Sequence, residues 1–280
     1  MFKKVLAVLL AGTLLVGCCT ACGTSEEEKQ GAYQAFQDAA KTINESSGYV
    51  FSLFGSLTTE YNDNSSMQGI SSRYTTKNQD GKQLVESYLS FSTTTQEPTS
   101  TILESDGTNY CVIDESGSSS SSADGTSTGN TVQELTQEQF QQMTGYGKIG
   151  TDFKAEDIKS VSTKNDEGNT SYEITLNRKN AVNLATWLME SISYIDTEQV
   201  PVDFDVDSLV CTVTVGENGE PKSFRYELET DMTAEGETLH AEYRVSYSIE
   251  QYGDEVQLEI PDLRSYLDAN VAASTDGATE

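Results

Sequence analysis

The residues of this chain whose side chains could do chemistry are five cysteines, one histidine and an aspartate-rich run. Cys18, Cys19 and Cys22 lie together near the N-terminus, whereas Cys111 and Cys211 lie in the body of the chain. Each of the last two sits in an apolar, strand-like stretch. They are therefore either a disulfide pair of an exported domain or two separate small apolar core residues. Spacing cannot show proximity, so both interpretations stay open.

His240 is the only histidine, and alternation along its strand places it opposite Leu239 and Ala241, beside Glu242 and Arg244. A lone histidine in that setting predicts a side chain that faces solvent. A metal site needs several ligands at set spacing, and no group of histidines and cysteines exists outside the N-terminal cysteines. We therefore predict no metal and no cofactor.

Asp203, Asp205 and Asp207 alternate in a Pro-Val-Asp-Phe-Asp-Val-Asp run, which is a weak indication of calcium. The run lacks the glycine and the downstream bidentate glutamate of an EF-hand loop. The chain also shows no glycine-rich phosphate loop, no G-x-S-x-G and no nucleophile with an evident base. Carboxylates are too abundant to single out a glycosidase pair. We predict a protein that is not an enzyme and has no catalytic residues.

The N-terminal segment has Lys3 and Lys4 at its front and an apolar run from Val5 to Val16 behind them. This is the layout of a secretory signal, and the run is too short to span a membrane. The signal peptide is expected to cover residues 1–17. Export implies a location outside the cytoplasm.

Leu15-Val16-Gly17-Cys18 closes that segment and resembles the lipobox of bacterial lipoproteins. The resemblance implies that Cys18 carries a lipid with palmitate-like acyl chains, becomes the new N-terminus and anchors the protein to the cell membrane. Cys22 follows Thr20-Ala21, which is a poorer lipobox because Cys19 stands where leucine is preferred. The alternative is an ordinary signal peptide that happens to contain cysteine.

The net charge of −28 limits the choice of partners. Neutralising phosphates requires clustered lysine and arginine, so nucleic acid is excluded as a partner. A polybasic patch for anionic lipid headgroups is excluded for the same reason. The acidic residues are interleaved with aromatic and β-branched ones, which predicts a solvated surface on a folded domain rather than a disordered acidic tail.

Hydrophobic periodicity predicts one folded domain over residues 31–268, between a lipidated tether at 18–30 and a flexible tail at 269–280. Helical spacing appears over 26–45, after Thr136 and over 178–193, and alternation predicts strands elsewhere. The Ser-rich stretch 115–130 is predicted to be a disordered surface loop. The predicted strands cover 49–61, 70–76, 84–94, 99–104, 110–113, 158–163, 172–176, 209–215, 224–232, 239–249 and 256–260.

Local signals mark several ends of these elements. Asp80-Gly81 and Asn218-Gly219 are typical of two-residue hairpin turns, because glycine accepts a positive φ. Thr136 and Gln139 form a capping box at the start of the second helix, and Leu135 can pack against Phe140. The predicted fold class is α+β, with a large curved antiparallel sheet, an N-terminal helix and a few covering helices.

This order of elements behind a lipobox resembles the LolA/LppX superfamily of lipoprotein carriers and lipid-binding lipoproteins, over about residues 30–265. The resemblance implies an incomplete barrel closed by helices, and an apolar cavity that binds a lipid or another hydrophobic ligand. One-sided apolar strands and helices supply the candidate ligand contacts. These are Phe36, Phe51, Leu53, Leu188, Tyr226, Tyr243 and Tyr247.

The same aromatic residues could instead fill a solid core. The chain would then be a non-catalytic surface interaction or sensory module. In either case the expected partner is the membrane, reached through the N-terminal lipid.

Overall fold

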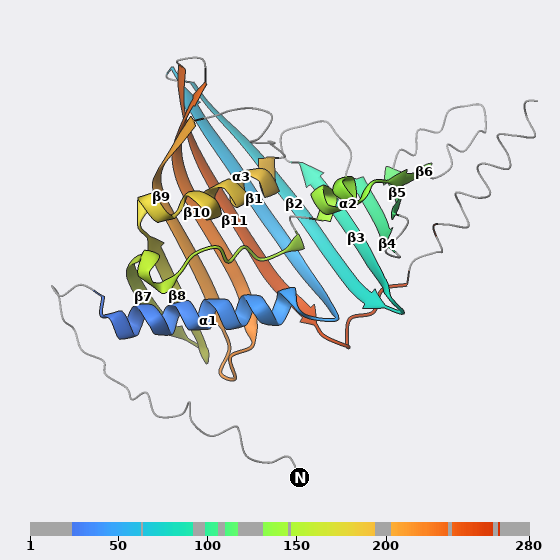
Figure 1. Cartoon of the computed structure of the whole chain (residues 1–280), viewed down its shortest axis with the longest axis horizontal. Coiled ribbons are helices and arrows are strands. Elements are labelled where there is room, and N and C mark those ends of the chain that lie inside the picture. Colours follow the sequence, from blue (N-terminus) through green and yellow to red (C-terminus); the bar gives the residue numbers. More distant parts are fainter. Residues whose placement is uncertain are drawn as a thin grey trace, which may run out of the picture.

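A computed structural model of the chain describes residues 24–62, 64–91, 99–105, 110–116, 131–144, 147–193, 203–234, 237–259 and 263 (Figure 1). The predicted signal, the lipid attachment at Cys18, the tail and positions 117–130 of the Ser-rich stretch lie outside the described residues. The elements in chain order are α1 (Glu26–Asn44), β1 (Gly48–Tyr61), β2 (Asn64–Gln79), β3 (Lys82–Phe91), β4 (Thr99–Ser105), β5 (Tyr110–Ser116), β6 (Thr131–Leu135), α2 (Gln137–Thr144), β7 (Ile158–Asp166), β8 (Asn169–Leu176), α3 (Val182–Ser193), β9 (Asp203–Val215), β10 (Pro221–Ala234) and β11 (Glu237–Tyr252).

All eleven strands belong to one antiparallel sheet in the order β6-β5-β4-β3-β2-β1-β11-β10-β9-β8-β7. Two meanders, β1–β6 and β7–β11, are joined where the first strand pairs with the last, from Tyr49 opposite Tyr252 to Glu60 opposite His240. The edge strands β6 and β7 do not pair with each other, so the sheet is open and not a closed barrel. The α+β class and the large antiparallel sheet are confirmed.

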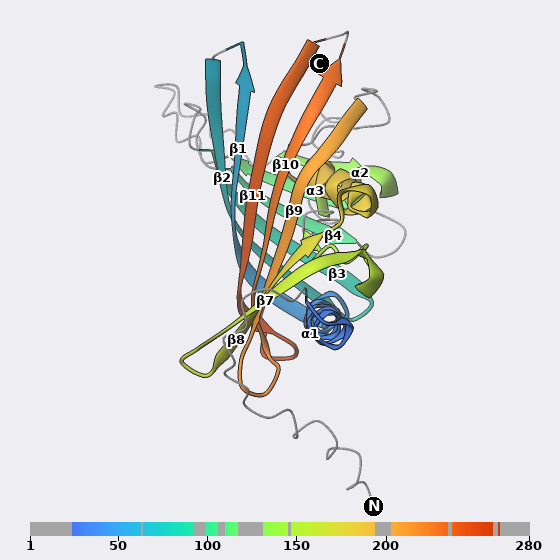
Figure 2. The same ribbon diagram turned by 90° about the vertical axis from the view of Figure 1, so that its left-hand side faces the viewer.

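The three helices lie on one side of the curved sheet (Figure 2). We call this side the covered face and the opposite side the outer face. Helix α1 packs on it through residues at helical spacing, since Ala32, Phe36, Ala40 and Ile43 are fully buried. Its start is fixed by Ser25, whose hydroxyl accepts from the backbone of Glu28 while the Glu28 carboxylate accepts from the backbone of Ser25.

That capping box corrects the predicted tether. Residues 26–30 of the segment 18–30 are the first turns of α1, so the domain begins before residue 31. The predicted strand at 256–260 is also wrong, because residues 256–259 form no strand. Strand β11 pairs with β1 on one edge and with β10 on the other, so the segment that follows it has no free edge of β11 to pair with.

One of the two predicted hairpin turns has the predicted length, and the other is longer than predicted. Asp80 (φ 53°) and Gly81 (φ 78°) join Gln79 to its partner Lys82, as predicted for a two-residue turn. At the second site the expected hairpin is present, because Val213 pairs with Phe224, but the loop covers 216–220. Gly219 alone has a positive φ there (79°), and its N–H donates to the Gly216 carbonyl at 2.9 Å.

The two body cysteines do not pair. Cys111 lies on β5 and Cys211 on β9, with six strands between them, so the path between them along the sheet is about 34 Å at ordinary strand spacing. A disulfide requires Cα atoms within about 7 Å. Cys211 is a free, fully buried thiol on the covered face, and burial raises its pKa. It therefore acts as a small apolar core residue.

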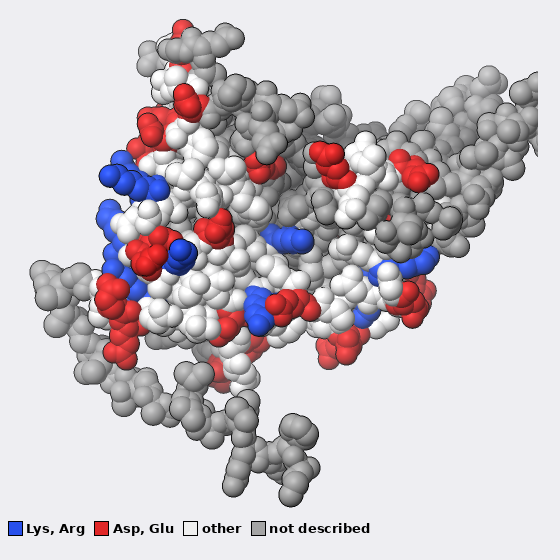
Figure 3. All heavy atoms as spheres, viewed as in Figure 1, with Lys and Arg blue, Asp and Glu red and all other residues white. Residues whose placement is uncertain are grey.

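On the side seen in Figure 3, acidic and basic side chains are interspersed with uncharged ones rather than gathered into one patch. This agrees with the predicted solvated surface. None of the described helices is long and apolar enough to cross a membrane.

Candidate functional site

The centre of the covered face is a layer of aromatic side chains. Side chains alternate along β2, β1, β11 and β10, and this alternation directs the rings of these four strands toward the covered face. Helices α1 and α3 and the irregular chain around Phe153 add further rings on top of them. The rings stack or meet edge to face, with centroids 5.1–6.2 Å apart. We call this set the aromatic layer. Its members are Phe36, Tyr49, Phe51, Tyr74, Phe153, Trp187, Phe224, Tyr226 and Tyr247.

All seven predicted ligand contacts lie in the single buried hydrophobic cluster that contains this layer. Phe36 of α1 is 6.2 Å from Tyr226 of β10 between ring centroids, and Phe51 of β1 is 5.2 Å from Tyr247 of β11. The other three members are equally enclosed; they are Leu53, Leu188 and Tyr243. The structure thus brings the seven side chains together, and their contact with a ligand stays a prediction.

An irregular stretch of chain, residues 147–153, crosses over the aromatic layer between α1 and α3 (Figure 1). We call it the crossing segment. The Tyr49 hydroxyl donates to the Gly147 carbonyl at 2.6 Å, and the Tyr226 hydroxyl donates to the Gly150 carbonyl at 2.8 Å. Asn44 of α1 both donates to and accepts from the backbone of Ile149 at 2.9 Å. Side-chain hydrogen bonds from both layers therefore hold this cover in place.

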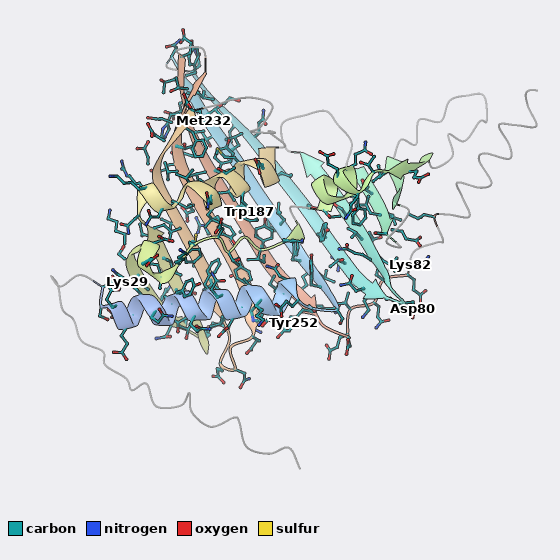
Figure 4. All side chains as sticks on the ribbon, viewed as in Figure 1. Lys29, Asp80, Lys82, Trp187, Met232 and Tyr252 are labelled. Carbon is teal, nitrogen blue, oxygen red and sulfur yellow. The ribbon has the colours of Figure 1, made fainter. Side chains whose placement is uncertain are left out.

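Two glycines let the crossing segment lie close to the rings. A Cβ on Gly147 would lie 2.5 Å from the Tyr74 ring, and one on Gly150 would lie 2.4 Å from the Trp187 ring. Trp187 projects from α3 toward the centre of the covered face (Figure 4). Any side chain at either glycine would push the segment away from the layer.

Two buried hydroxyls have no hydrogen-bond partner among the described residues: Tyr247 Oη within the aromatic layer and Ser72 Oγ beside it. Tyr247 is fully buried and Ser72 is 4% exposed. Leu53 of β1 lies between them, because it pairs with Tyr247 on one side and with Ser72 on the other. Burial raises the pKa of Tyr247, so its hydroxyl stays protonated.

A hollow of about 190 Å³ adjoins the aromatic layer beneath α2. Tyr49 and Tyr74 form its inner wall, and Phe140 and Thr144 of α2 form part of its outer wall. Tyr74 and Ser72 are two residues apart on β2, so they share the covered face. The hollow is thus next to the strand that carries one of the two unpartnered hydroxyls.

A second group of polar side chains lies on the outer face, at the end of the sheet where β9, β10 and β11 meet. Ligand atoms of Asp207, Asp231 and His240 all lie within 4.8 Å of one another, a donor set that could hold a divalent cation. His240 Nδ1 is 2.8 Å from Asp231 Oδ1, and this hydrogen bond raises the pKa of His240. Arg178 lies 3.4 Å from Asp207 and already neutralises part of the group.

Sequence spacing did not predict that group, because its members come from three strands and one β-bulge at Glu229/Thr230. His240 does face the outer side of the sheet with Glu242 and Arg244, as alternation predicts. The side chains are open to solvent. Exposed acidic groups of this kind are common without a bound ion, so the group by itself does not indicate a metal site.

Three solved structures are similar to this chain over most of their length. A DUF1329 family protein from Desulfovibrio piger is 8% identical, with a TM-score of 0.26, covering 82% of this chain and 94% of that one. A LolA superfamily protein from Nitrosomonas europaea is 10% identical, with a TM-score of 0.24 and coverage of 81% and 97%. A domain described as an outer membrane lipoprotein-sorting protein, from Vibrio parahaemolyticus, is 9% identical, with a TM-score of 0.23 and coverage of 87% and 99%.

No family model matches the chain, and a search of curated proteins finds no match either. The TM-scores above are too low to establish a common fold.

Proposed function

We propose that this protein binds a hydrophobic ligand between the covered face of its sheet and the helices. The observation that carries this proposal is the pair of unpartnered hydroxyls, Tyr247 and Ser72, inside an apolar layer. Leaving a buried hydroxyl unsatisfied costs about 1–3 kcal/mol, and phenylalanine and alanine would fill the same space without that cost. Hydroxyls kept there are best explained by a ligand that completes their hydrogen bonds.

The cover over the site supports this proposal. After Gly147 the crossing segment has no helix or strand, and it is held by individual hydrogen bonds from four side chains, those of Tyr49, Tyr226, Asn44 and Gln37. Breaking a few such bonds requires less free energy than separating a packed helix, since each contributes about 0.5–1.5 kcal/mol. The hollow beneath α2 gives a ligand a place to enter beside Tyr74. The role involves binding only, without catalysis.

The N-terminal segment sets where this binding takes place. We propose that residues 1–17 are removed and that Cys18 carries the lipid, which holds the domain on the membrane outside the cytoplasm. Two or three acyl chains anchor a protein stably, whereas a single chain is marginal at about 0.8 kcal/mol per buried CH₂.

The anchor is tested in cells that process lipoproteins. Cys18→Ala is expected to leave uncleaved precursor, whereas Cys22→Ala should be processed normally. Mass spectrometry of the mature N-terminus should find the lipid on Cys18. Lipid on Cys22 would refute this part of the proposal.

Ligand binding is tested on the unlipidated domain, residues 24–280. Organic extraction of the purified protein should release lipid, and an uncharged fluorescent probe such as diphenylhexatriene should bind saturably. Phe51→Leu, on the covered face, should weaken probe binding. Phe54→Leu on the outer face of the same strand, where the ring is 56% exposed, should not. No extracted lipid and no saturable binding would indicate an interaction module with a solid core.

A further inference from the structure

The side chains of the covered face also limit which class of ligand could bind there. This inference rests on the proposed function. We propose that the ligand is an uncharged acyl ester of the monoacylglycerol type, and that Tyr247 and Ser72 bind its ester and hydroxyl oxygens. The proposal follows from where the two hydroxyls stand and from which charged groups lie near them.

The two hydroxyls occupy one transverse row of the covered face. Ser72 on β2, Leu53 on β1 and Tyr247 on β11 are direct neighbours across three adjacent strands, and Phe224 on β10 continues the row. Strand spacing puts the Cα atoms of Ser72 and Tyr247 about 10 Å apart. Leu53 stands between the two residues, so a ligand with one carboxylate or one alcohol offers a single polar group to two separate hydroxyls. A glyceryl ester carries several oxygens along a short chain and can meet both.

The buried core that the structure describes contains no charge that could neutralise an ionic ligand, and Lys148, which lines the hollow beneath α2, is exposed to solvent. No lysine, arginine or histidine is among the buried residues of this core, and its only buried carboxylate is Glu104. Glu104 lies on the other side of β4 from Leu103, forms an ion pair with Lys82 and accepts from the backbone of Leu263. Burying an ionised group without a partner is strongly unfavourable. A fatty acid anion or an amine would be unpaired beside Tyr247, whereas an ester would not.

Both hydroxyls suit ester oxygens. A tyrosine hydroxyl and a serine hydroxyl each donate one hydrogen bond and also accept, so they can donate to an ester carbonyl and accept from a glycerol hydroxyl. Tyr247 remains a donor at all ordinary pH values because its phenol is not ionised. The acyl chain would then lie along the aromatic layer, among Phe51 and the neighbouring rings.

The test is displacement of diphenylhexatriene from the unlipidated domain at about pH 8 by monomyristoylglycerol and by myristate, which have the same acyl chain. The wild-type protein should bind the monoacylglycerol at least about tenfold more tightly than the anion. Tyr247→Phe and Ser72→Ala should each weaken monoacylglycerol binding by about 2- to 13-fold, the range expected for one lost hydrogen bond. The probe has no polar group, so its affinity for each variant measures the change in apolar packing alone, and the loss of monoacylglycerol binding is taken relative to it.

Matched controls come from the outer face. Tyr88→Phe and Ser71→Ala make the same chemical changes on β3 and β2 at exposed positions, and they should leave both affinities unchanged. Equal or tighter binding of myristate, or control-like behaviour of both test variants while the probe still binds, would overturn the ester assignment and leave the proposed function standing. Absence of probe binding would instead overturn the proposed function.

Discussion

The two halves of the sheet bury different kinds of side chain. The half formed by β7–β11 lies under α1 and α3, and its buried residues are apolar except for Thr230. The half formed by β2–β6 lies under the eight-residue α2, and many of its buried residues are polar. The buried polar residues of this second half are Ser72, Thr76, Ser87 and Ser105 on the covered face, Thr75 and Glu104 on the other side of their strands, and Thr144 of α2.

This contrast separates a region with an apolar core from a region in which hydroxyl groups are buried. In the polar half most hydroxyls still have partners, as when Thr76 donates to the Leu84 carbonyl at 3.2 Å and Thr144 donates to the Phe140 carbonyl at 2.9 Å. Ser72 is the exception, and it lies on the strand next to the central pair β1 and β11. The apolar half supplies stability, whereas the boundary between the halves carries the two unsatisfied hydroxyls on which the proposed ligand site rests.

The largest expected effect is in the apolar half. Phe36→Ala should lower the free energy of unfolding by about 3–5 kcal/mol, because its ring lies within 5.1–6.2 Å of three other rings and leaves a cavity. Urea denaturation measures the loss. Phe54→Ala on the outer face should cost less than about 1 kcal/mol. Similar costs for both would contradict the division between a packed face and a solvated one.

The crossing segment is tested by adding single methyl groups. Gly147→Ala and Gly150→Ala should each destabilise by about 1–3 kcal/mol, since the new Cβ would overlap the Tyr74 or Trp187 ring. Gly31→Ala is the control, because this exposed helical glycine has nothing within 4 Å of an added Cβ. It should stabilise by about 0.5–1 kcal/mol. If all three changes were neutral, the cover would be more loosely placed than the structure shows.

Two tyrosines on neighbouring strands should respond in opposite ways. Tyr226→Phe removes a hydroxyl that donates to Gly150, which should cost about 0.5–1.5 kcal/mol in the ligand-free protein. Tyr247→Phe removes a hydroxyl without a described partner, so the ligand-free protein should be as stable or more stable. Thermal melting of delipidated samples distinguishes the two. A clear loss in Tyr247→Phe would show that its hydroxyl is satisfied within the protein.

The smallest expected effect on stability concerns the exposed pair of Asp231 and His240 at the end of the outer face. The hydrogen bond to Asp231 raises the pKa of His240 above its unfolded value, so the pair stabilises the fold fully below about pH 6.5. This contribution should disappear as the pH rises through the raised pKa, and it should stay under about 1 kcal/mol because the side chains are solvated. Urea midpoints at about pH 5.5 and 8.5 should differ less in Asp231→Asn than in the parent protein. An unchanged difference would contradict the coupling.

Local sequence signals predicted much of the fold because each acts over a few residues. The turn at Asp80-Gly81, the capping box of Thr136 with Gln139, and the alternation of the last strands are all read from neighbours in the chain. The strand β6 was missed because Thr131–Leu135 follows the Ser-rich stretch and shows too short a pattern. The strand expected at 256–260 failed because pairing partners are a property of the whole sheet.

The site was predictable only in part, for a similar reason. Alternation showed that Phe51, Leu53 and Tyr247 share a face, and the structure confirms their burial. It could not show that the Tyr247 hydroxyl lacks an acceptor, since the groups around a side chain come from distant segments such as residues 147–153. The approach of Asp207 to His240 likewise depends on three strands and a bulge.

The pairing of β1 with β11 has a consequence for how the chain reaches its fold. Strands near the two ends of the domain sit side by side at the middle of the sheet, with Glu60 opposite His240 about 180 residues later in the chain. A chain that emerges N-terminus first must hold β1 with one unpaired edge until nearly the whole domain has appeared. Such long-range closure slows folding, and an open strand edge invites pairing with other chains. We expect truncation before β11 to expose two edges at the centre of the sheet and to produce aggregates instead of a smaller folded unit.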